Sequence, residues 1–280
     1  MMLRRHQPSR TVLVISYVFL FGAVVAAIFP IIWTISTSVK QKVDALSIPP
    51  KWFNFSPTFE NYRTVLSSPE FRGAVRVSLV VTAAATTLTV GVAILLSYAL
   101  VRMRTPGRRL LVLLLVLAQT IPVVVLVTPL FNLAVKLDLY DNIWLVTVIL
   151  SALTLPFSTW VMVAFMRSIP VELEEAAFVD GARRFAVLRY VVLPLVKPGI
   201  ATCAIFSAIG VWSAFLVPSV LGEKDARTLP VVIAGYISAR TIDWGPLTAA
   251  ASLTMLPIIL FTIFAQRLLV SGLTIGGVRG

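Results

Sequence analysis

Six long apolar segments alternate with polar segments along the chain. Each apolar segment is at least about 20 residues long, which is the length a helix needs to cross the hydrocarbon core of a bilayer. A membrane β-barrel would show short strands of alternating polarity instead. The pattern therefore predicts an all-α membrane protein, formed as a single transmembrane domain over residues 1–280, whose helices satisfy their own backbone hydrogen bonds in lipid. The predicted spans are Thr11–Trp33, Ser78–Val101, Leu110–Phe131, Asn142–Met166, Gly199–Leu221 and Pro246–Leu269.

The composition supports a lipid environment, because 58% of the residues are hydrophobic and only 13% are charged. The formal charge of +12 is unevenly spread over the predicted loops. If both termini are cytoplasmic, the inside segments hold 14 of the 24 basic residues but only four of the 12 acids. This is the positive-inside pattern of a multi-pass membrane protein, and it leaves no separate basic patch for nucleic acid. The inside basic residues are Arg4, Arg5, Arg10, Arg102, Arg104, Arg108, Arg109, Arg167, Arg183, Arg184, Arg189, Lys197, Arg267 and Arg279.

The predicted loops differ in length and composition. Outside lie a segment of about residues 40–72, the short loop Asn132–Asp141 and the longer loop Gly222–Gly245. Inside lies a short loop, Arg102–Arg109, whose Thr105-Pro106-Gly107 run indicates a turn. The first apolar run is longer than the core of a signal peptide, so we expect it to remain as the first helix.

The second inside loop, of about residues 167–198, holds all four cytoplasmic acids. It is expected to form two short helices. Ser168 is expected to cap the first of them, with Pro170 near its first turn. Three glutamates then follow, and negative charge is favourable near a helix N-terminus. The second helix is expected from Arg183 to Val192 and to end at Leu193-Pro194.

This loop contains a specific motif. It reads Glu175-Ala176-Ala177-Phe178-Val179-Asp180-Gly181-Ala182, and nine residues separate Gly181 from Val191-Val192-Leu193-Pro194. The run resembles the EAA loop of binding-protein-dependent ABC importer permeases, and it differs only in Val191, where that family usually has Ile. The resemblance implies the type I importer fold of six helices with a cytoplasmic coupling helix. It also implies that Glu175, Ala176, Ala177, Asp180, Gly181, Ala182 and Arg183 contact an ATPase.

The resemblance extends beyond the loop. The segment Thr58–Tyr62, the run Thr128–Phe131 and the tail Gly272–Gly280 are similar to the carbohydrate branch of the family, and within it to the maltose-type "G" permease. One departure stands in the fifth span, where many relatives carry Trp-Asn-Glu/Asp-Phe and this chain carries Trp212-Ser213-Ala214-Phe215. The loss of an amide and a carboxylate there weakens the assignment of a particular sugar.

The chain has no nucleotide site of its own, because none of its six lysines follows a glycine as a phosphate-binding loop requires. The resemblance implies that ATP and magnesium bind to two separate ATPase subunits, whose closure moves the coupling loops and switches the pathway between its two faces. The chain is then a transporter subunit with no catalytic residue and no metal site. The other implied partners are a second permease, an extracytoplasmic binding protein, a sugar-type solute and membrane lipid.

The translocation pathway should be lined by polar or aromatic side chains, because polar groups are costly in lipid. The same residue types also bond across helix interfaces, so packing remains an alternative for each of them. Pro122, Pro156, Pro218 and Pro257 are expected to bend the helices that hold them. The candidate pathway residues are Gln119, Thr120, Ser158, Trp212, Ser213 and Phe215.

Three other functions remain open at this point. The first is an ABC importer for a non-sugar solute such as an amino acid, phosphate or sugar acid. The second is an ion-coupled secondary transporter, although no carboxylate lies within the six spans to bind a proton or sodium ion. The third is a membrane receptor or assembly subunit without transport.

Overall fold

The structure is a computed structural model that describes residues 10–103, 106–238 and 242–276, the last of these ranges by its backbone alone from residue 264 onward. Arg4, Arg5, Arg104, Thr105 and Arg279, like the last residues of the tail and the side chain of Arg267, lie outside the described part of the chain. The described residues form helices and contain no strand, as predicted. They divide into two compact units, Met1–Ser68 with Tyr236–Thr254, and Pro69–Gly235 with Met255–Gly280.

In the first unit, α1 (Arg10–Ser38) is apolar on all sides, and only Thr37 and Ser38 are buried along it. A helix that is apolar all round and has no covering within its own unit requires lipid or another protein around it. α1 extends the first predicted span by one turn or more at its C-terminal end.

The C-terminal end of α1 is fastened to the outer segment, which contains α2 (Lys42–Ala45) and α3 (Glu60–Ser67). The Ser38 and Tyr62 hydroxyls are 2.6 Å apart, and the Asn61 amide donates to the carbonyls of Ser38 and Lys40. The Lys40 ammonium is buried and lies 4.5 Å from the centre of the Trp33 ring. Burial lowers the pKa of Lys40, and the nearby Asp44 carboxylate offsets part of that change.

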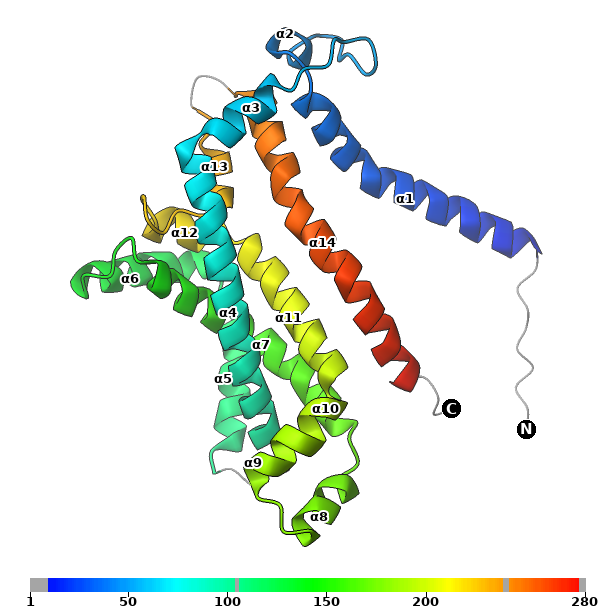
Figure 1. The fold of residues 1–280 in the computed structure, drawn as a ribbon, viewed down its shortest axis with the longest axis vertical. Helices are drawn as coiled ribbons and strands as arrows, with labels where there is room; N and C mark the ends of the chain where they lie inside the picture. Colours follow the sequence, from blue (N-terminus) through cyan, green and yellow to red (C-terminus); the bar gives the residue numbers. More distant parts are fainter. Residues whose placement is uncertain (1–9, 104–105, 239–241, 277–280) are drawn as a thin grey trace. The chain divides into compact units, whose positions relative to one another are not determined.

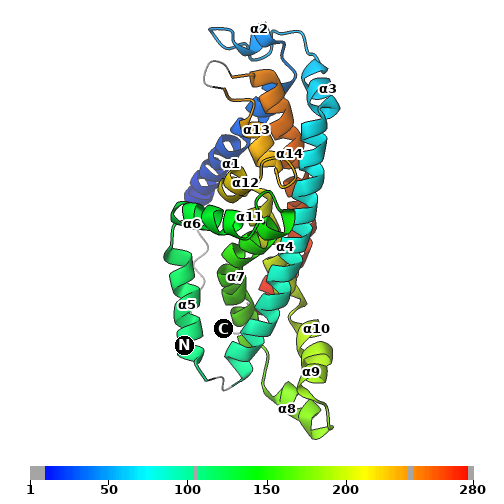
Figure 2. The ribbon, with the colours of Figure 1, turned by 90° about the vertical axis from the view of Figure 1, so that its left-hand side faces the viewer.

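The second unit is organised around three helices that pack side by side, α4 (Pro69–Arg102), α7 (Ile143–Arg167) and α11 (Lys197–Trp212) (Figures 1 and 2). Gly199 permits the close approach of α11 to α7, because a Cβ there would lie 2.6 Å from the Phe165 ring. One apolar core lies toward the end that carries the EAA motif and includes Val90, Met162, Val192 and Cys203. A second core includes Val81, Val146, Val211 and Leu221.

The third predicted span is broken. α5 (Arg108–Thr120) and α6 (Val123–Lys136) meet at a bend of 100°, and α6 runs past the predicted end at Phe131. Pro122 lies at the bend and is extended. Proline has no N–H to continue the helix, and it disfavours helical geometry in the residue before it, Ile121, which is also extended.

The fifth span also differs from the single helix predicted over Gly199–Leu221. α11 ends at Trp212, and a separate short helix, α12 (Leu216–Leu221), follows. The outer loop beyond it contains α13 (Leu229–Ala234), and α14 (Trp244–Gly276) forms the last span. Over the described residues, four helices are continuous and apolar enough to cross a membrane. Two bent pairs bring the number to six if each pair is taken as one span. The first pair is α5 with α6, at the third predicted span, and the second joins Arg184–Leu195 to Lys197–Trp212, so it begins before the fifth predicted span and ends before Leu221.

The helices of the EAA loop begin and end elsewhere than predicted. The first is α8 (Glu172–Val179), and Ser168 does not cap it, because Ser168 ends α7 and its hydroxyl donates to the Phe165 carbonyl. The second begins as α9 (Arg184–Val187), widens into the π-helical η1 (Leu188–Val192) and continues as α10 (Leu193–Leu195). Pro194 does not end it, since proline is tolerated in the first turn of a helical segment.

Candidate functional site: the EAA loop and the helix core

α8 ends in a compact turn at Gly181. The N–H of Gly181 donates to the Phe178 carbonyl, and the N–H of Ala182 donates to the Ala177 carbonyl. This is the Schellman pattern, which requires a left-handed residue after the cap. Gly181 has a φ of 83°, and no atom lies within 4 Å of the place where a Cβ would be. The glycine of the EAA motif therefore serves a turn here and no close approach within this chain.

The EAA residues face two ways. Glu175, Ala176, Asp180, Gly181 and Arg183 are exposed. Ala177 and Ala182, which the resemblance implies as ATPase contacts, are half-buried and pack against the core that contains Val192 and Met166. This placement follows from the turn at Gly181, which folds the chain back so that the alanines before and after it face the core.

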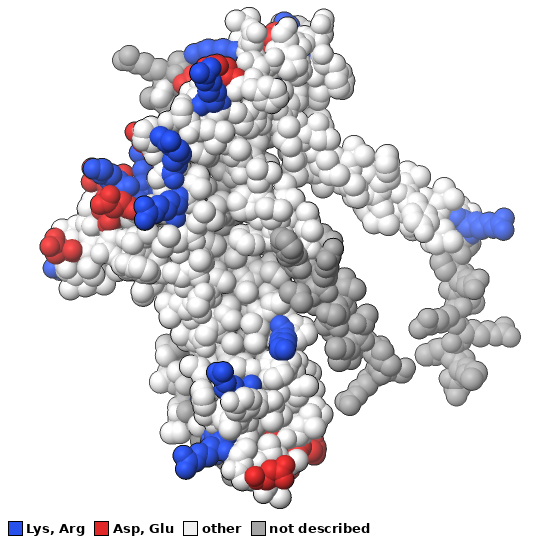
Figure 3. Space-filling view, viewed as in Figure 1, with Lys and Arg blue, Asp and Glu red and all other residues white. Residues whose placement is uncertain are grey.

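Apolar side chains are exposed beside the acids of this loop. Phe178 and Val179 follow Ala177 in the chain, and Val179 is 88% exposed. Phe185 and Tyr190 on the following helices are also largely exposed. In Figure 3 acidic side chains lie over α8 at this end of the unit, so apolar and charged groups are interleaved on one surface. Such a mixture is typical of a surface that contacts another protein.

The structure adds two residues that the sequence reasoning did not select. Glu174 points inward and is 2% exposed, and its carboxylate pairs with Arg102, the last residue of α4, at 2.6 Å. Glu174 is one of three neighbouring acids and Arg102 one of several neighbouring basic residues. No local pattern distinguishes this pair, whose members are 72 positions apart in the sequence.

The six candidate pathway residues do not form one cluster. Gln119 and Thr120 are exposed at the end of α5, and Ser213 and Phe215 are exposed between α11 and α12. Trp212 is 2% exposed, so its ring belongs to the interior of this unit.

Ser158 lies beside a small cavity between α7 and α11. Its hydroxyl is buried and has no hydrogen-bond partner within the described part of the chain. The cavity has a volume of about 250 Å³. The Thr154 hydroxyl, also at this cavity, lies 3.0 Å from that of Thr89 and accepts from Ser207 at 3.4 Å. The lining residues are Leu153, Thr154, Phe157, Ser158, Phe206 and Ser207.

At the other end of α7, Asp141 holds the outer loop that follows α12. Its carboxylate accepts four consecutive backbone N–H groups, those of residues 223–226, at 2.9–3.0 Å. Burial acts to raise the pKa of Asp141, but these four hydrogen bonds outweigh it and hold the pKa below its usual value. Asp141 itself has a φ of 58°. The loop borders a groove of about 880 Å³ that Arg76, Trp144 and Arg227 also line.

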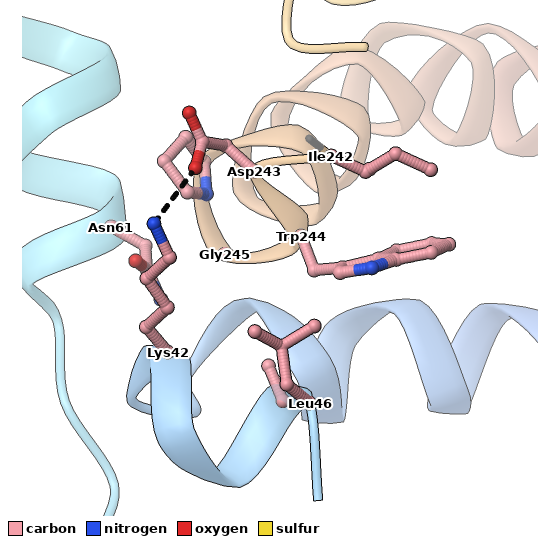
Figure 4. Close-up of a pocket in the computed structure, with 9 residues that line it drawn as sticks. Lys42, Leu46, Asn61, Ile242, Asp243, Trp244 and Gly245 are labelled. Atoms are coloured by element: carbon pink, nitrogen blue, oxygen red, sulfur yellow. Dashed lines mark hydrogen bonds and ion pairs between the residues drawn. The ribbon is translucent and has the colours of Figure 1, made fainter. Parts of the chain in front are cut away.

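A smaller pocket of about 210 Å³ lies in the first unit, between α2 and the start of α14 (Figure 4). Lys42 points toward Asp243, 3.4 Å away, while Trp244 and Leu46 form the apolar side. Both charged side chains are at least half exposed, so their ion pair adds little to stability.

The sequence profile of the family described as "Binding-protein-dependent transport system inner membrane component" matches residues 85–275. This range covers α7, the EAA loop and α11, together with the C-terminal half of α4. The chain belongs to this family and is a membrane-embedded, multi-pass permease subunit of an ABC importer, not an enzyme.

Curated relatives match over nearly the whole chain. A diacetylchitobiose uptake system permease protein of Streptomyces coelicolor is 34% identical over 257 residues, which cover 91% of this chain and 93% of that protein. A sulfoquinovosyl glycerol transport system permease protein of Agrobacterium fabrum is 34% identical and covers 91% of this chain and 90% of its own length. A trehalose transport system permease protein of Mycobacterium tuberculosis is 35% identical, with coverage of 91% and 93%.

The fold matches that of a solved importer. A chain of a bacterial ABC transporter involved in the import of the acidic polysaccharide alginate superposes with a TM-score of 0.75, at 21% identity, over 93% of this chain and 98% of that one. The predicted type I importer permease fold is therefore confirmed.

Proposed function

We propose that this chain forms half of the pathway of an ABC importer for a sugar or a sugar derivative. The other half is a second permease, and an extracytoplasmic binding protein delivers the solute. Two ATPase subunits, which hold ATP and magnesium, dock on the cytoplasmic side, where both termini also lie. The importer family is established, and the names of the three relatives above, each referring to a saccharide or a glycoside, support the sugar class.

The observation that supports the coupling role is the solvent-exposed surface of α8. It presents Glu175 and Asp180 next to Phe178 and Val179 on a loop that precedes the fifth span. The carboxylates offer charge-assisted hydrogen bonds to a partner. The apolar side chains would lose their water contact in the same interface. An ATPase groove that accepts an amphipathic helix fits this surface.

The pathway role rests on the hydroxyl-lined cavity between α7 and α11. Ser158, Thr154 and Ser207 place three hydroxyl groups beside the aromatic pair Phe157 and Phe206, whose ring centres are 5.5 Å apart. Hydroxyls and aromatic faces suit a neutral sugar. A place along the same pathway stays a prediction for Gln119, Thr120, Trp212, Ser213 and Phe215.

The coupling surface is tested with Glu175→Lys in the whole complex. The substitution places a cation where the motif has an anion, so we expect the ATPase to co-purify poorly and uptake to fall at unchanged permease expression. Glu172→Lys is the matched control, because Glu172 is an exposed acid in the same turn but outside the motif. Wild-type uptake and ATPase retention in Glu175→Lys would overturn the coupling assignment.

The sugar class is tested separately, by the rate of ATP hydrolysis of the reconstituted complex with its binding protein. We expect mono- or oligosaccharides to stimulate hydrolysis, and amino acids, phosphate and sugar acids to leave it at the basal rate. Stimulation by one of the latter alone would refute the sugar class while leaving the importer assignment intact. Uptake without ATP would instead indicate an ion-coupled transporter.

A further inference from the structure

Arg102 lies where three segments of the second unit meet. It is the last residue of α4, and its Nε donates to Glu174 Oε1 of α8 at 2.6 Å. Its Nη2 donates to the Met166 carbonyl at 3.1 Å and to the Ile169 carbonyl at 2.7 Å. Tyr98, one turn earlier on α4, donates to the other oxygen of Glu174 at 3.2 Å. One guanidinium thus connects the ends of α4 and α7 with the first turn of α8.

The cluster is buried, although it lies next to the exposed coupling surface. The side chains of Arg102 and Glu174 are 12% and 3% exposed. A buried ion pair costs desolvation on both sides, and its net contribution to stability is often close to zero. A general gain in stability is therefore not sufficient to account for charges at this position.

The guanidinium has a geometry that a lysine lacks. It is planar and presents several N–H donors in a fixed fork, whereas an ammonium is a compact point charge on a flexible stem. The carbonyl of Met166 lies in the last turn of α7 and accepts the Ile169 N–H at 3.4 Å. Arg102 adds a shorter hydrogen bond to this carbonyl and one to that of Ile169, so it holds the start of the loop that leads to α8.

α8 also packs on α9 and η1. Ala177 and Ala182 pack against the core beneath it. Within the described part of the chain, Glu174 is the one residue of α8 whose side chain forms an ion pair or a hydrogen bond. Four residues, 168–171, separate α7 from α8. The Arg102 contacts bridge these four residues and join α8 to the ends of α4 and α7.

We propose that Arg102 is a positioning residue that clamps α8 to the ends of α4 and α7, so that a displacement of the docked ATPase moves these helices and not the loop alone. The proposal rests on the proposed docking of α8 on an ATPase. It assigns a role in energy transmission to a pair that makes no contact with ATP or with the solute. It also explains why a charged pair is placed at a buried position.

The test uses the full importer in proteoliposomes, with Arg102→Met, Glu174→Met and the double variant Arg102→Met/Glu174→Met. Each single variant leaves one buried charge without its partner and should lower the melting temperature. The double variant removes both charges and should recover it. We nevertheless expect the double variant to retain its ATPase and to hydrolyse ATP, while the solute taken up per ATP falls by about tenfold. Wild-type uptake per ATP in the double variant would overturn the proposal.

Matched controls use exposed residues of the same segments. Arg167 ends α7 and Glu172 begins α8, and both are exposed. Arg167→Met/Glu172→Met removes the same two charges from the same end of the unit and should leave uptake per ATP unchanged. Hydrogen exchange gives a second measurement, in which residues 171–183 should exchange faster in the Arg102→Met/Glu174→Met variant than in this control. Equal exchange in the two would also overturn the proposal.

Failure of the clamp is distinguishable from failure of the docking assignment. If Glu175→Lys loses the ATPase but the double variant transports normally, the clamp alone is wrong. If Glu175→Lys changes nothing, the docking assignment is wrong and the clamp falls with it. Should the double variant not assemble, Arg102→Lys takes its place, because it keeps a charge for Glu174 but not the fork for Met166 and Ile169. Uptake per ATP should then fall severalfold, and an unchanged value would refute the clamp.

Discussion

Glu174 and Asp141 each hold a loop at one end of α7, but they do so with different partners. Glu174 follows the C-terminal end of α7 and pairs with the side chain of Arg102. Asp141 precedes the N-terminal end of α7 and accepts backbone N–H groups of residues 223–226. A side-chain partner can be lost by mutation or by movement of its helix. Backbone N–H groups persist in every residue except proline. Asp141 therefore fixes the conformation of one loop, whereas Glu174 joins separate helices.

The largest effect is expected for Glu174→Gln. The amide has nearly the same shape but no charge, so Arg102 is left buried beside a neutral group. Losing a charged hydrogen bond at a buried site costs about 2–3 kcal/mol. We expect a lower melting temperature of the purified complex and a loss of most uptake. Wild-type values for both would show that the contact between Glu174 and Arg102 does not depend on the charge of Glu174.

A smaller and local effect is expected for the matching change at the outer end, Asp141→Asn. Asparagine tolerates the positive φ of this position, so the backbone is not strained. It loses the charge and can accept only part of the four hydrogen bonds, at a cost of about 1–2 kcal/mol. Amide hydrogens of residues 223–226 should exchange faster, while exchange in α8 stays unchanged. A change in α8 would mean that the two ends of α7 are coupled.

The pH dependence sharpens the same comparison. The pKa of Asp141 is lowered in the folded protein, so its contribution to stability is fully present above the unfolded value of about 3.9. That contribution is lost as the pH falls below about 4 and through the folded pKa. Protection of residues 223–226, corrected for intrinsic exchange, should stay constant from neutral pH to about 4 and then decline. The Asp141→Asn variant should lack this decline, and its persistence there would assign the effect to another group.

The smallest effect is expected at Asn142, which caps the start of α7. Its side chain accepts the N–H groups of Trp144 and Leu145 at 2.8 and 3.2 Å. Asn142→Ala should cost about 1 kcal/mol, the usual value for a lost helix cap. Asn142→Asp keeps the acceptor and is the control. We expect a small fall in melting temperature for the alanine variant and wild-type uptake per ATP for both, since this end of α7 does not contact α8.

The sequence predicted the parts of the fold that depend on local patterns. Apolar length located six spans, and Pro122 was among the residues expected to bend them, although the 100° bend at this position splits the third span into two helices. The EAA spacing identified the family, which the family profile confirms. The cap at Ser168 was placed wrongly, because a hydroxyl that can begin one helix can equally end the one before it.

The sequence by itself thus determined that the protein is a multi-pass importer permease with one acidic loop between two late spans, because hydrophobic length and motif spacing are properties of neighbouring residues. Only the tertiary structure decided which of the acids Glu172, Glu174 and Glu175 faces inward, and that Arg102 is its partner. It also decided that Asp141 holds a loop more than 80 positions away. Burial and pairing are set by how distant segments pack, and residues of the same type in the same turn become different only when that packing exposes one and buries the other.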